Sequence, residues 1–292
     1  MTTTTPVVPP NGTVDDRATL RHANTSAPTM RRQGLGRAIA SEWIKIRTLR
    51  STWIGMTLVL LILVGFGALA AAMSTGSVTG PDDGGPPNGT DPLSVVLTGA
   101  TFAVLVVGVL GSLAGAREYS SRMIAATIAA VPRRWQVVVS KSVVFAVLTA
   151  ITAVIGVLGA FWIGMAVLSS GDAATVALTD DGILRELLGM AAYITAIGLL
   201  GLGLGILLRS VAGSIGAVVA GVMILPPLAG ALLPTSWDAV LQYFPSSAGA
   251  AFTTVQGAGT EVLSAGAGTA VLSVWVLAAL GGAIISINRR DA

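Results

Sequence analysis

The sequence has no cysteine and a single histidine, His22, among its 292 residues. Without cysteine there are no disulfide frameworks, thiolate metal sites or cysteine nucleophiles, and one histidine leaves little histidine-based catalysis. Charge is scarce as well: 11% of the residues are charged, against about 25% in soluble globular proteins. With 53% hydrophobic residues and a mean hydropathy of +0.80, the chain cannot cover a water-facing surface. We therefore expect an all-α membrane protein rather than a soluble enzyme.

Motifs for nucleotide binding and hydrolysis are also missing. No G-x-x-x-x-G-K-[ST] loop occurs, and the two lysines, Lys45 and Lys141, lie outside any glycine-rich turn. The H-E-x-x-H and G-x-S-x-G patterns are absent, which argues against a membrane protease or esterase. We predict no catalytic residue, no bound cofactor and no metal in this chain.

Six apolar runs are long enough to cross a membrane, since about 20 helical residues span a hydrocarbon core of about 30 Å. Their continuous apolar character favours helices over the alternating pattern of a β-barrel. The segment before them, residues 1–34, is polar and is predicted to be a disordered cytoplasmic tail, with residues 35–292 forming the transmembrane domain. The runs lie near 53–73, 93–116, 142–168, 187–208, 211–233 and 264–287.

The distribution of basic residues predicts the orientation. Sixteen of the 17 Lys and Arg fall before the first run, between the second and third, in the turn after the fourth, or at the C-terminus. The other three connections hold only Arg185 among basic residues, and nine acids. Because Lys and Arg concentrate on the cytoplasmic side, both termini are expected in the cytoplasm. Topology and anionic lipid headgroups account for the basic residues, so no nucleic-acid partner is predicted.

Residues 35–50 are predicted to form an amphipathic interfacial helix, an elbow before the first span. Glu42 falls inside its apolar stripe, which is costly unless the carboxylate is paired or faces protein. The helix is either a simple interfacial anchor or an elbow that also touches a cytoplasmic partner. Its predicted interfacial residues are Leu35, Ile39, Glu42, Trp43 and Ile46.

Residues 117–141 make the longest inward-facing connection between spans. Ser120 or Ser121 can cap a short helix, and Pro132 ends it. Met123, Ile124 and Ile128 would supply its apolar side chains. This helix is either a docking surface for a soluble partner or a cytoplasmic extension of the second and third spans.

The stretch 234–261 is too apolar for an ordinary loop, and Pro234 and Pro245 divide it into pieces too short to cross. We expect a re-entrant or interfacial outer helix, which either caps an exit pathway or packs on the membrane surface.

Glycine is common, at 36 residues, and two pairs have the spacing that lets membrane helices approach closely. Gly111 with Gly115, and Gly201 with Gly205, are predicted to pack helices together rather than bind phosphate.

The arrangement resembles the ABC-2-type permeases, the membrane subunits of ABC exporters. The segment SEWIKIRTLRSTW (41–53) is similar to their elbow, and REYSSRMIAATIAAVPRRWQVVVSK (117–141) resembles the first cytoplasmic loop, which carries the coupling helix. Six spans with both ends inside and an outer helix near 236–252 also match. Arg122 departs from the glycine expected there. The loop pattern consists of Glu118, Thr127, Pro132, Arg133 and Lys141.

The resemblance implies a bacterial cell-membrane subunit that works with a separate ATPase, present in two copies and carrying ATP and Mg²⁺. It also implies a second permease copy or a paralogue, and export by alternating access. An ion-coupled secondary transporter and a membrane scaffold or assembly protein are the alternatives. The coupling residues that the resemblance implies are Glu118, Tyr119, Met123, Ile124, Ile128, Pro132 and Arg133.

Overall fold

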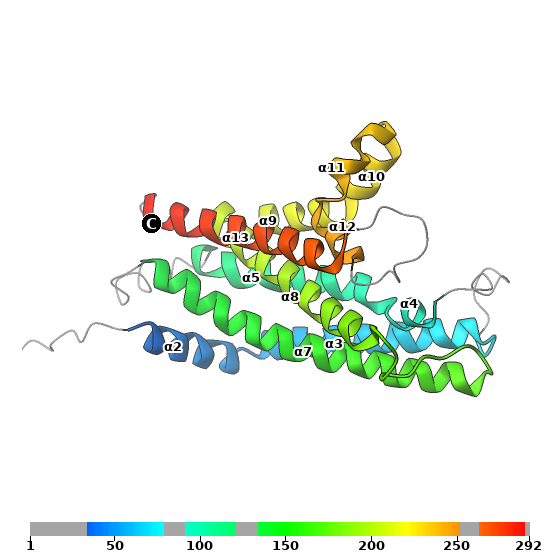
Figure 1. Cartoon of the computed structure of the whole chain (residues 1–292). Helices are drawn as coiled ribbons and strands as arrows, with labels where there is room; N and C mark the ends of the chain where they lie inside the picture. The colour runs from blue at the N-terminus through cyan, green and yellow to red at the C-terminus, as the bar shows by residue number, and fades with distance from the viewer. Residues whose placement is uncertain (1–33, 79–90, 121–133, 252–262, 290–292) are drawn as a thin grey trace, which may run out of the picture. The chain divides into compact units, whose positions relative to one another are not determined.

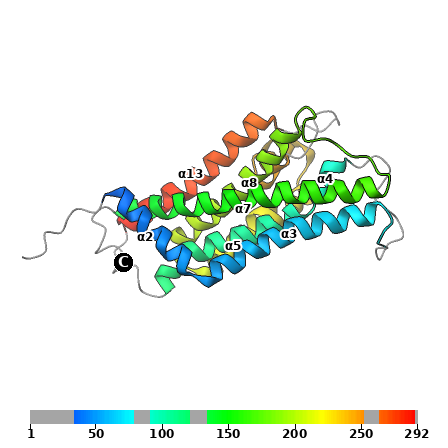
Figure 2. The same ribbon diagram turned by 90° about the horizontal axis from the view of Figure 1, so that it is seen from below.

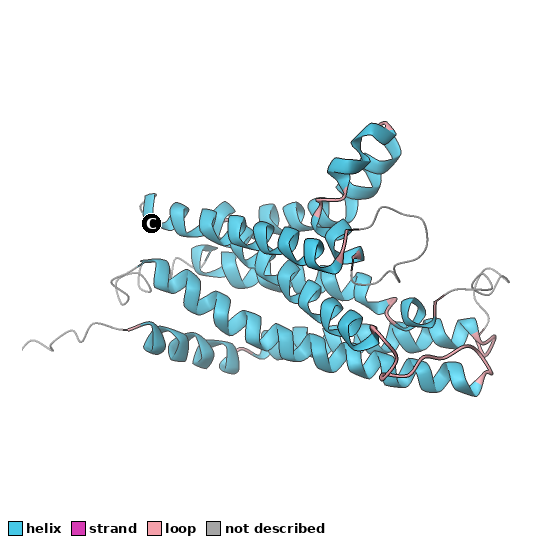
Figure 3. Ribbon diagram, viewed as in Figure 1, coloured by secondary structure: helices cyan, strands magenta, loops and turns pink. Residues whose placement is uncertain are grey.

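The computed structural model describes residues 34–78, 91–120, 134–251 and 263–289, and all regular secondary structure in these ranges is helical (Figures 1 and 3). Within these ranges six helices are long and apolar enough to cross a membrane, as the sequence predicted. The predicted tail falls on residues 1–33, outside the described part of the chain. The six candidate spans are Arg50–Ser74, Gly99–Arg117, Arg134–Ser170, Ile183–Leu208, Val211–Leu232 and Ala265–Arg289.

Shorter helices precede, interrupt and follow these spans. The described elements are α2 (Leu35–Thr48), α3 (Arg50–Ser74), α4 (Pro92–Val96), α5 (Gly99–Ser120), α7 (Arg134–Ser170), α8 (Ile183–Leu208), α9 (Val211–Val219), η1 (Ala220–Ile224), α10 (Leu225–Leu232), η2 (Thr235–Trp237), α11 (Asp238–Leu241), α12 (Pro245–Ala250) and α13 (Ala265–Arg289).

The second predicted run, 93–116, is two helices rather than one. The side chain of Asp91 caps α4 by accepting from the backbone N–H groups of Leu93 and Ser94, at 3.4 and 3.2 Å. Helix α4 ends at Val96, and α5 begins at Gly99, where an added Cβ would lie 2.6 Å from the carbonyl oxygen of Ile62. The break therefore comes where α5 closely approaches α3.

The fifth predicted run, 211–233, is helical but not uniform. A π-turn, η1, separates α9 from α10 just before Pro226 and Pro227. Proline has no N–H, and its ring clashes with the carbonyl four residues earlier, so a wider turn relieves the conflict.

The third span is longer than predicted. Helix α7 has 37 residues, or about 55 Å at 1.5 Å per residue, against a hydrocarbon core of about 30 Å. It begins at Arg134 instead of 142, and its first turns contain the buried polar residues Gln136, Ser140 and Lys141. This extension packs against α2.

Helix α8 lies at the centre of the bundle and packs against α5, α7, α9 and α13 (Figure 2). In its most apolar stretch of 18 residues, 61% of the residues are buried, whereas in that of the fifth span only 11% are. Ile194, Ile197 and Leu202 on α8 are fully buried. The core of the chain is therefore built around the fourth span.

The outer stretch predicted as one helix consists of short pieces, η2, α11 and α12, in its described part. Pro245 occupies the first turn of α12, where a missing N–H costs nothing. Residues 252–262 lie outside the described part.

Candidate functional site

The described basic residues, with the exception of Arg185, gather at one end of the bundle, and most described acids lie at the other. One end, here called the basic end, gathers α2, the end of α5, the start of α7, the α8–α9 turn and the end of α13 (Figure 2). The opposite, acidic end carries Arg185 as its only described basic residue. Described acids there are Asp91, Asp172, Asp180, Asp181 and Glu186. Described basic residues at the basic end are Arg37, Lys45, Arg47, Arg50, Arg117, Arg134, Lys141, Arg209 and Arg289.

A buried ion triad joins α2 to α7 at the basic end. Glu42 is only 3% exposed, and its Oε1 accepts from Lys45 Nζ at 2.7 Å while its Oε2 accepts from Lys141 Nζ at 3.0 Å. Lys141 is 8% exposed, whereas the Lys45 side chain is 42% exposed. The acid inside the apolar stripe thus faces protein and is paired, which offsets its desolvation.

The remaining predicted elbow residues divide between two environments. Leu35, Ile39 and Ile46 are half-buried, and Ile46 packs on the apolar cluster that contains Met56 and Val138. Trp43 is 43% exposed. Helix α2 is therefore fixed to the bundle along one side and presents an aromatic residue on another.

The junction from α2 into the first span is held by polar contacts. The indole N–H of Trp53 donates to the carbonyl oxygen of Arg47 at 3.1 Å. Arg117, at the end of α5, donates to Ser51 Oγ at 3.2 Å. These contacts link the start of α3 with both neighbouring elements.

The two ends of the 121–133 segment are tied to the rest of the basic end. The guanidinium of Arg209, in the α8–α9 turn, lies 5.0 Å from the ring centroid of Tyr119 and donates to the carbonyl oxygen of Ser286 at 3.4 Å. Arg134 donates to the carbonyl oxygen of Ile287 at 3.1 Å. Both ends of the segment therefore connect to α13, one through the α8–α9 turn.

Most predicted coupling residues lie outside the described part of the chain. Tyr119 is half-buried in the last turn of α5, and Glu118 is helical, with its side chain undescribed. The others are Met123, Ile124, Ile128, Pro132 and Arg133, all within 121–133.

Sequence reasoning did not identify Lys141, Arg134 and Arg209 as contacts of this site. The partner of Glu42 is 99 residues away, a separation that no local pattern reveals. Arg209 offered one signal: a basic residue in a two-residue turn between helices, which adopts a left-handed φ of 52°.

The four glycines singled out for packing lie where α5 meets α8, at what we call the glycine contact. A Cβ at Gly111 would overlap the carbonyl oxygen of Gly198, and one at Gly205 would lie 2.6 Å from that of Ser112. Gly115 and Gly201 face backbone in the same way. The two backbones touch directly, an approach that only glycine permits.

A family model supplies the comparison with known proteins. The model described as ABC-2 family transporter protein matches residues 38–224, well over half of the chain, from the first turn of α2 to the end of η1. No protein among the curated sequences matches. The matched region includes the ion triad, the glycine contact and both flanks of the 121–133 segment. The chain belongs to the ABC-2 family of transporter proteins, as a membrane-spanning permease subunit.

Proposed function

We propose that this chain is the membrane subunit of an ATP-driven exporter in the bacterial cell membrane. Two copies of a separate ATPase, which bind ATP and Mg²⁺, dock at the basic end, and a second permease copy completes the pathway. The observation that carries this proposal is the set of contacts around the 121–133 segment, within a chain of the ABC-2 family. Nucleotide-driven movement of the ATPases switches the two permeases between inward-open and outward-open states.

The contacts at the basic end explain how a local push can move whole helices. Force applied to 121–133 reaches α5 through Tyr119 and α7 through Arg134. Because these residues contact Arg209 and α13, and Glu42 joins α7 to α2, the ends of these helices move together. The glycine contact then carries the displacement of α5 into α8 along their length.

The proposed orientation places the basic end in the cytoplasm, in keeping with the excess of Lys and Arg there. The chain is free of cysteine, so single cysteines can be added at exposed serines at each end. A membrane-impermeant thiol reagent added to intact cells should label Ser169→Cys and leave Ser51→Cys unlabelled until the membrane is permeabilised. The reverse pattern would overturn the orientation.

The fifth span supports the proposal of a second permease copy. Only 11% of its apolar window is buried within the chain, and Leu228 and Leu232 are 48% and 72% exposed. Apart from buried residues such as Val218, its apolar side chains are therefore open to contacts outside this chain, in lipid or in a partner permease.

Co-purification tests the function. A tagged chain solubilised from its native membrane should bring with it an ATPase that has a Walker-type phosphate loop, in equal copy number. The complex should hydrolyse ATP. If the purified chain catalysed gradient-driven uptake without such an ATPase, the chain would be a secondary transporter. If it neither bound an ATPase nor catalysed uptake, a scaffold role would be favoured.

A further inference from the structure

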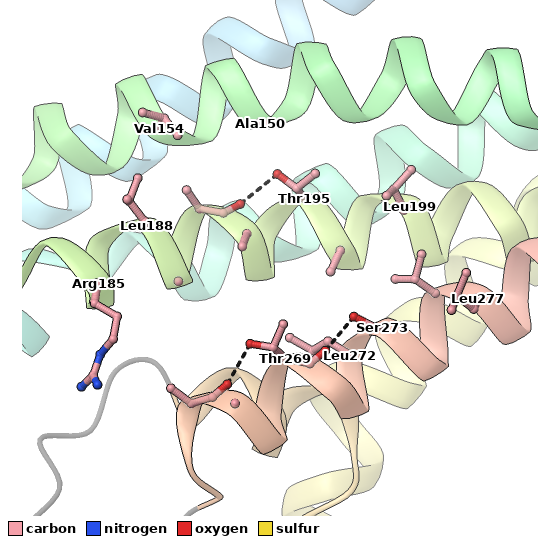
Figure 4. A pocket seen from close by; sticks show the side chains of 17 residues that line it. Ala150, Val154, Arg185, Leu188, Thr195, Leu199, Thr269, Leu272, Ser273 and Leu277 are labelled. Atoms are coloured by element: carbon pink, nitrogen blue, oxygen red, sulfur yellow. Dashed lines mark hydrogen bonds between the residues drawn. The ribbon is translucent and has the colours of Figure 1, made fainter. Parts of the chain in front are cut away.

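An apolar cavity of about 900 Å³ lies between α7, α8 and α13 (Figure 4). Its size falls within the range of about 300–1,000 Å³ that is usual for ligand sites. Arg185 stands at one end of this groove, and Leu199 and Leu277 at the other. Arg185 and Leu199 are 14 positions apart on one helix, so the groove is about 20 Å long at 1.5 Å per residue.

In the acidic half of the bundle, α12 packs against both α8 and α13. Gly249 of α12 packs on the ring of Tyr193, and a Cβ at Gly268 of α13 would lie 2.9 Å from the carbonyl oxygen of Ala248. Near the basic end α8 and α13 meet directly, because a Cβ at Gly203 would lie 2.9 Å from the Cβ of Ala279. The space opposite α12 is left unfilled by the lining side chains.

The walls of the groove offer a hydrocarbon surface. Their three hydroxyl groups donate to carbonyl oxygens of their own helices: Thr195 at 2.8 Å, Thr269 at 2.7 Å and Ser273 at 2.8 Å (Figure 4). The remaining lining residues, apart from Arg185, are aliphatic or glycine. The walls therefore suit an apolar chain and offer no hydroxyl proton to a polar ligand.

Arg185 supplies a positive charge at one end of the groove. The side chain is exposed, and no hydrogen bond or ion pair within the described residues engages it. Its neighbour Glu186 is buried and does not line the groove, although the positive charge of Arg185 acts on its carboxylate. The guanidinium is thus available to an anionic group placed above the apolar walls.

The rim of the groove is continuous with the surface that faces lipid. Leu188 and Leu277, which line the groove, are 47% and 68% exposed, and Ile151, Ile155 and Val274 on its flanking helices are exposed as well. We propose that the groove holds an acyl chain of a membrane phospholipid, with its phosphate bound by Arg185. Its length of about 20 Å accommodates the hydrocarbon depth of one leaflet, about 15 Å. The proposed orientation assigns this lipid to the outer leaflet, so that assignment rests on the proposed function.

Photocross-linking of the full chain in nanodiscs tests this site. A phosphatidylglycerol with a diazirine on one acyl chain should label peptides of 183–199 and 265–277. The double variant Ala192→Leu/Ala196→Leu fills the groove and should abolish that labelling. Its matched control, Ala270→Leu/Ala278→Leu, adds the same volume to exposed positions of α13 outside the groove and should leave it intact.

Arg185→Gln tests the headgroup contact without altering the walls. It should reduce the preference for phosphatidylglycerol over phosphatidylcholine by roughly two- to fivefold, the range of an exposed ion pair. Labelling that ignores the groove-filling pair, or labelling of these peptides at background level, would overturn the proposal and favour an exported compound as the occupant. An unchanged preference in Arg185→Gln would overturn the headgroup contact.

The experiment needs neither ATPase nor transport, so its outcome is separate from that of the proposed function. Normal labelling with no ATPase in the purified complex would refute the function and leave the lipid site standing. The opposite combination would refute the lipid site alone.

Discussion

The fourth and fifth spans contrast two uses of glycine in one membrane chain. In α8, Gly201 and Gly205 face the backbone of α5, and the apolar window of the helix is 61% buried. In the fifth span, a Cβ at Gly216, Gly221 or Gly230 would meet nothing within 4 Å, and the window is 11% buried. Glycine thus builds the core around the fourth span, whereas most of the fifth span is exposed on the surface of this chain.

The largest effect is expected from a large side chain in the glycine contact. Gly111→Leu should destabilise the folded chain by more than about 3 kcal/mol, because the added atoms meet the backbone carbonyl of Gly198, which cannot move aside. Denaturant unfolding of the detergent-solubilised chain measures it. A variant as stable as the parent would show that α5 and α8 do not touch here.

Glu42→Gln is expected to cost about 3–5 kcal/mol, because Lys141 is then buried without a counter-charge. The pairwise replacement Glu42→Leu/Lys141→Met should recover most of the loss, since apolar residues of similar volume can replace a buried pair. Lys45→Met removes the more exposed of the two ion pairs of Glu42 and should cost only about 0.2–1 kcal/mol. A loss for Lys45→Met as large as that for Glu42→Gln would contradict the buried character of the link between α2 and α7.

A smaller effect is expected where α5 meets the α8–α9 turn. Tyr119→Leu should lose about 0.5–2 kcal/mol of cation–π interaction with Arg209, and Tyr119→Phe should lose less because the ring remains. A double-mutant cycle with Arg209→Gln isolates this coupling. A coupling energy of zero would show that this contact does not help to transmit movement from the 121–133 segment to α8 and α13.

The smallest effect on stability is expected from a large side chain at an exposed glycine of the fifth span. Gly221→Leu should change the stability of the detergent-solubilised chain by no more than about 0.5 kcal/mol, since the added side chain meets open space. If a second permease copy packs on the fifth span, the same variant should lower the dimer fraction in native mass spectrometry. Loss of monomer stability as large as for Gly111→Leu would erase the contrast.

Much of the fold could be predicted because apolar run length is a local property. The six spans were predicted this way, and Asp91–Pro92 is a local signal for the start of α4, near the predicted start of the second run. The start of α7 at Arg134 agrees with the alternative that residues 117–141 partly extend the second and third spans. Hydropathy placed it at 142 because Arg134, Gln136 and Lys141 are polar, but tertiary contacts with α2 and α13 allow the helix to extend.

The candidate site was predictable in part for the same reason. The position of Glu42 in an apolar stripe indicated that it needs a partner, yet the partner, Lys141, comes from a helix distant in sequence. The glycine spacing is local and pointed to residues that lie at the α5–α8 contact. Contacts between helix ends, such as Tyr119 with Arg209, depend on how the bundle assembles.

The central claim is that an ATPase docks on the segment between α5 and α7. The most direct measurement is the affinity of the co-purifying ATPase for the chain in nanodiscs, with and without Met123→Asp, Ile124→Asp and Ile128→Asp together. The matched control places three aspartates at exposed positions of the acidic end, Val78→Asp, Ala174→Asp and Thr175→Asp. We predict that the first triple variant weakens binding by about 100-fold or more, as loss of clustered interface anchors does, while the control binds normally. Equal affinity of both triple variants and the parent would contradict the account.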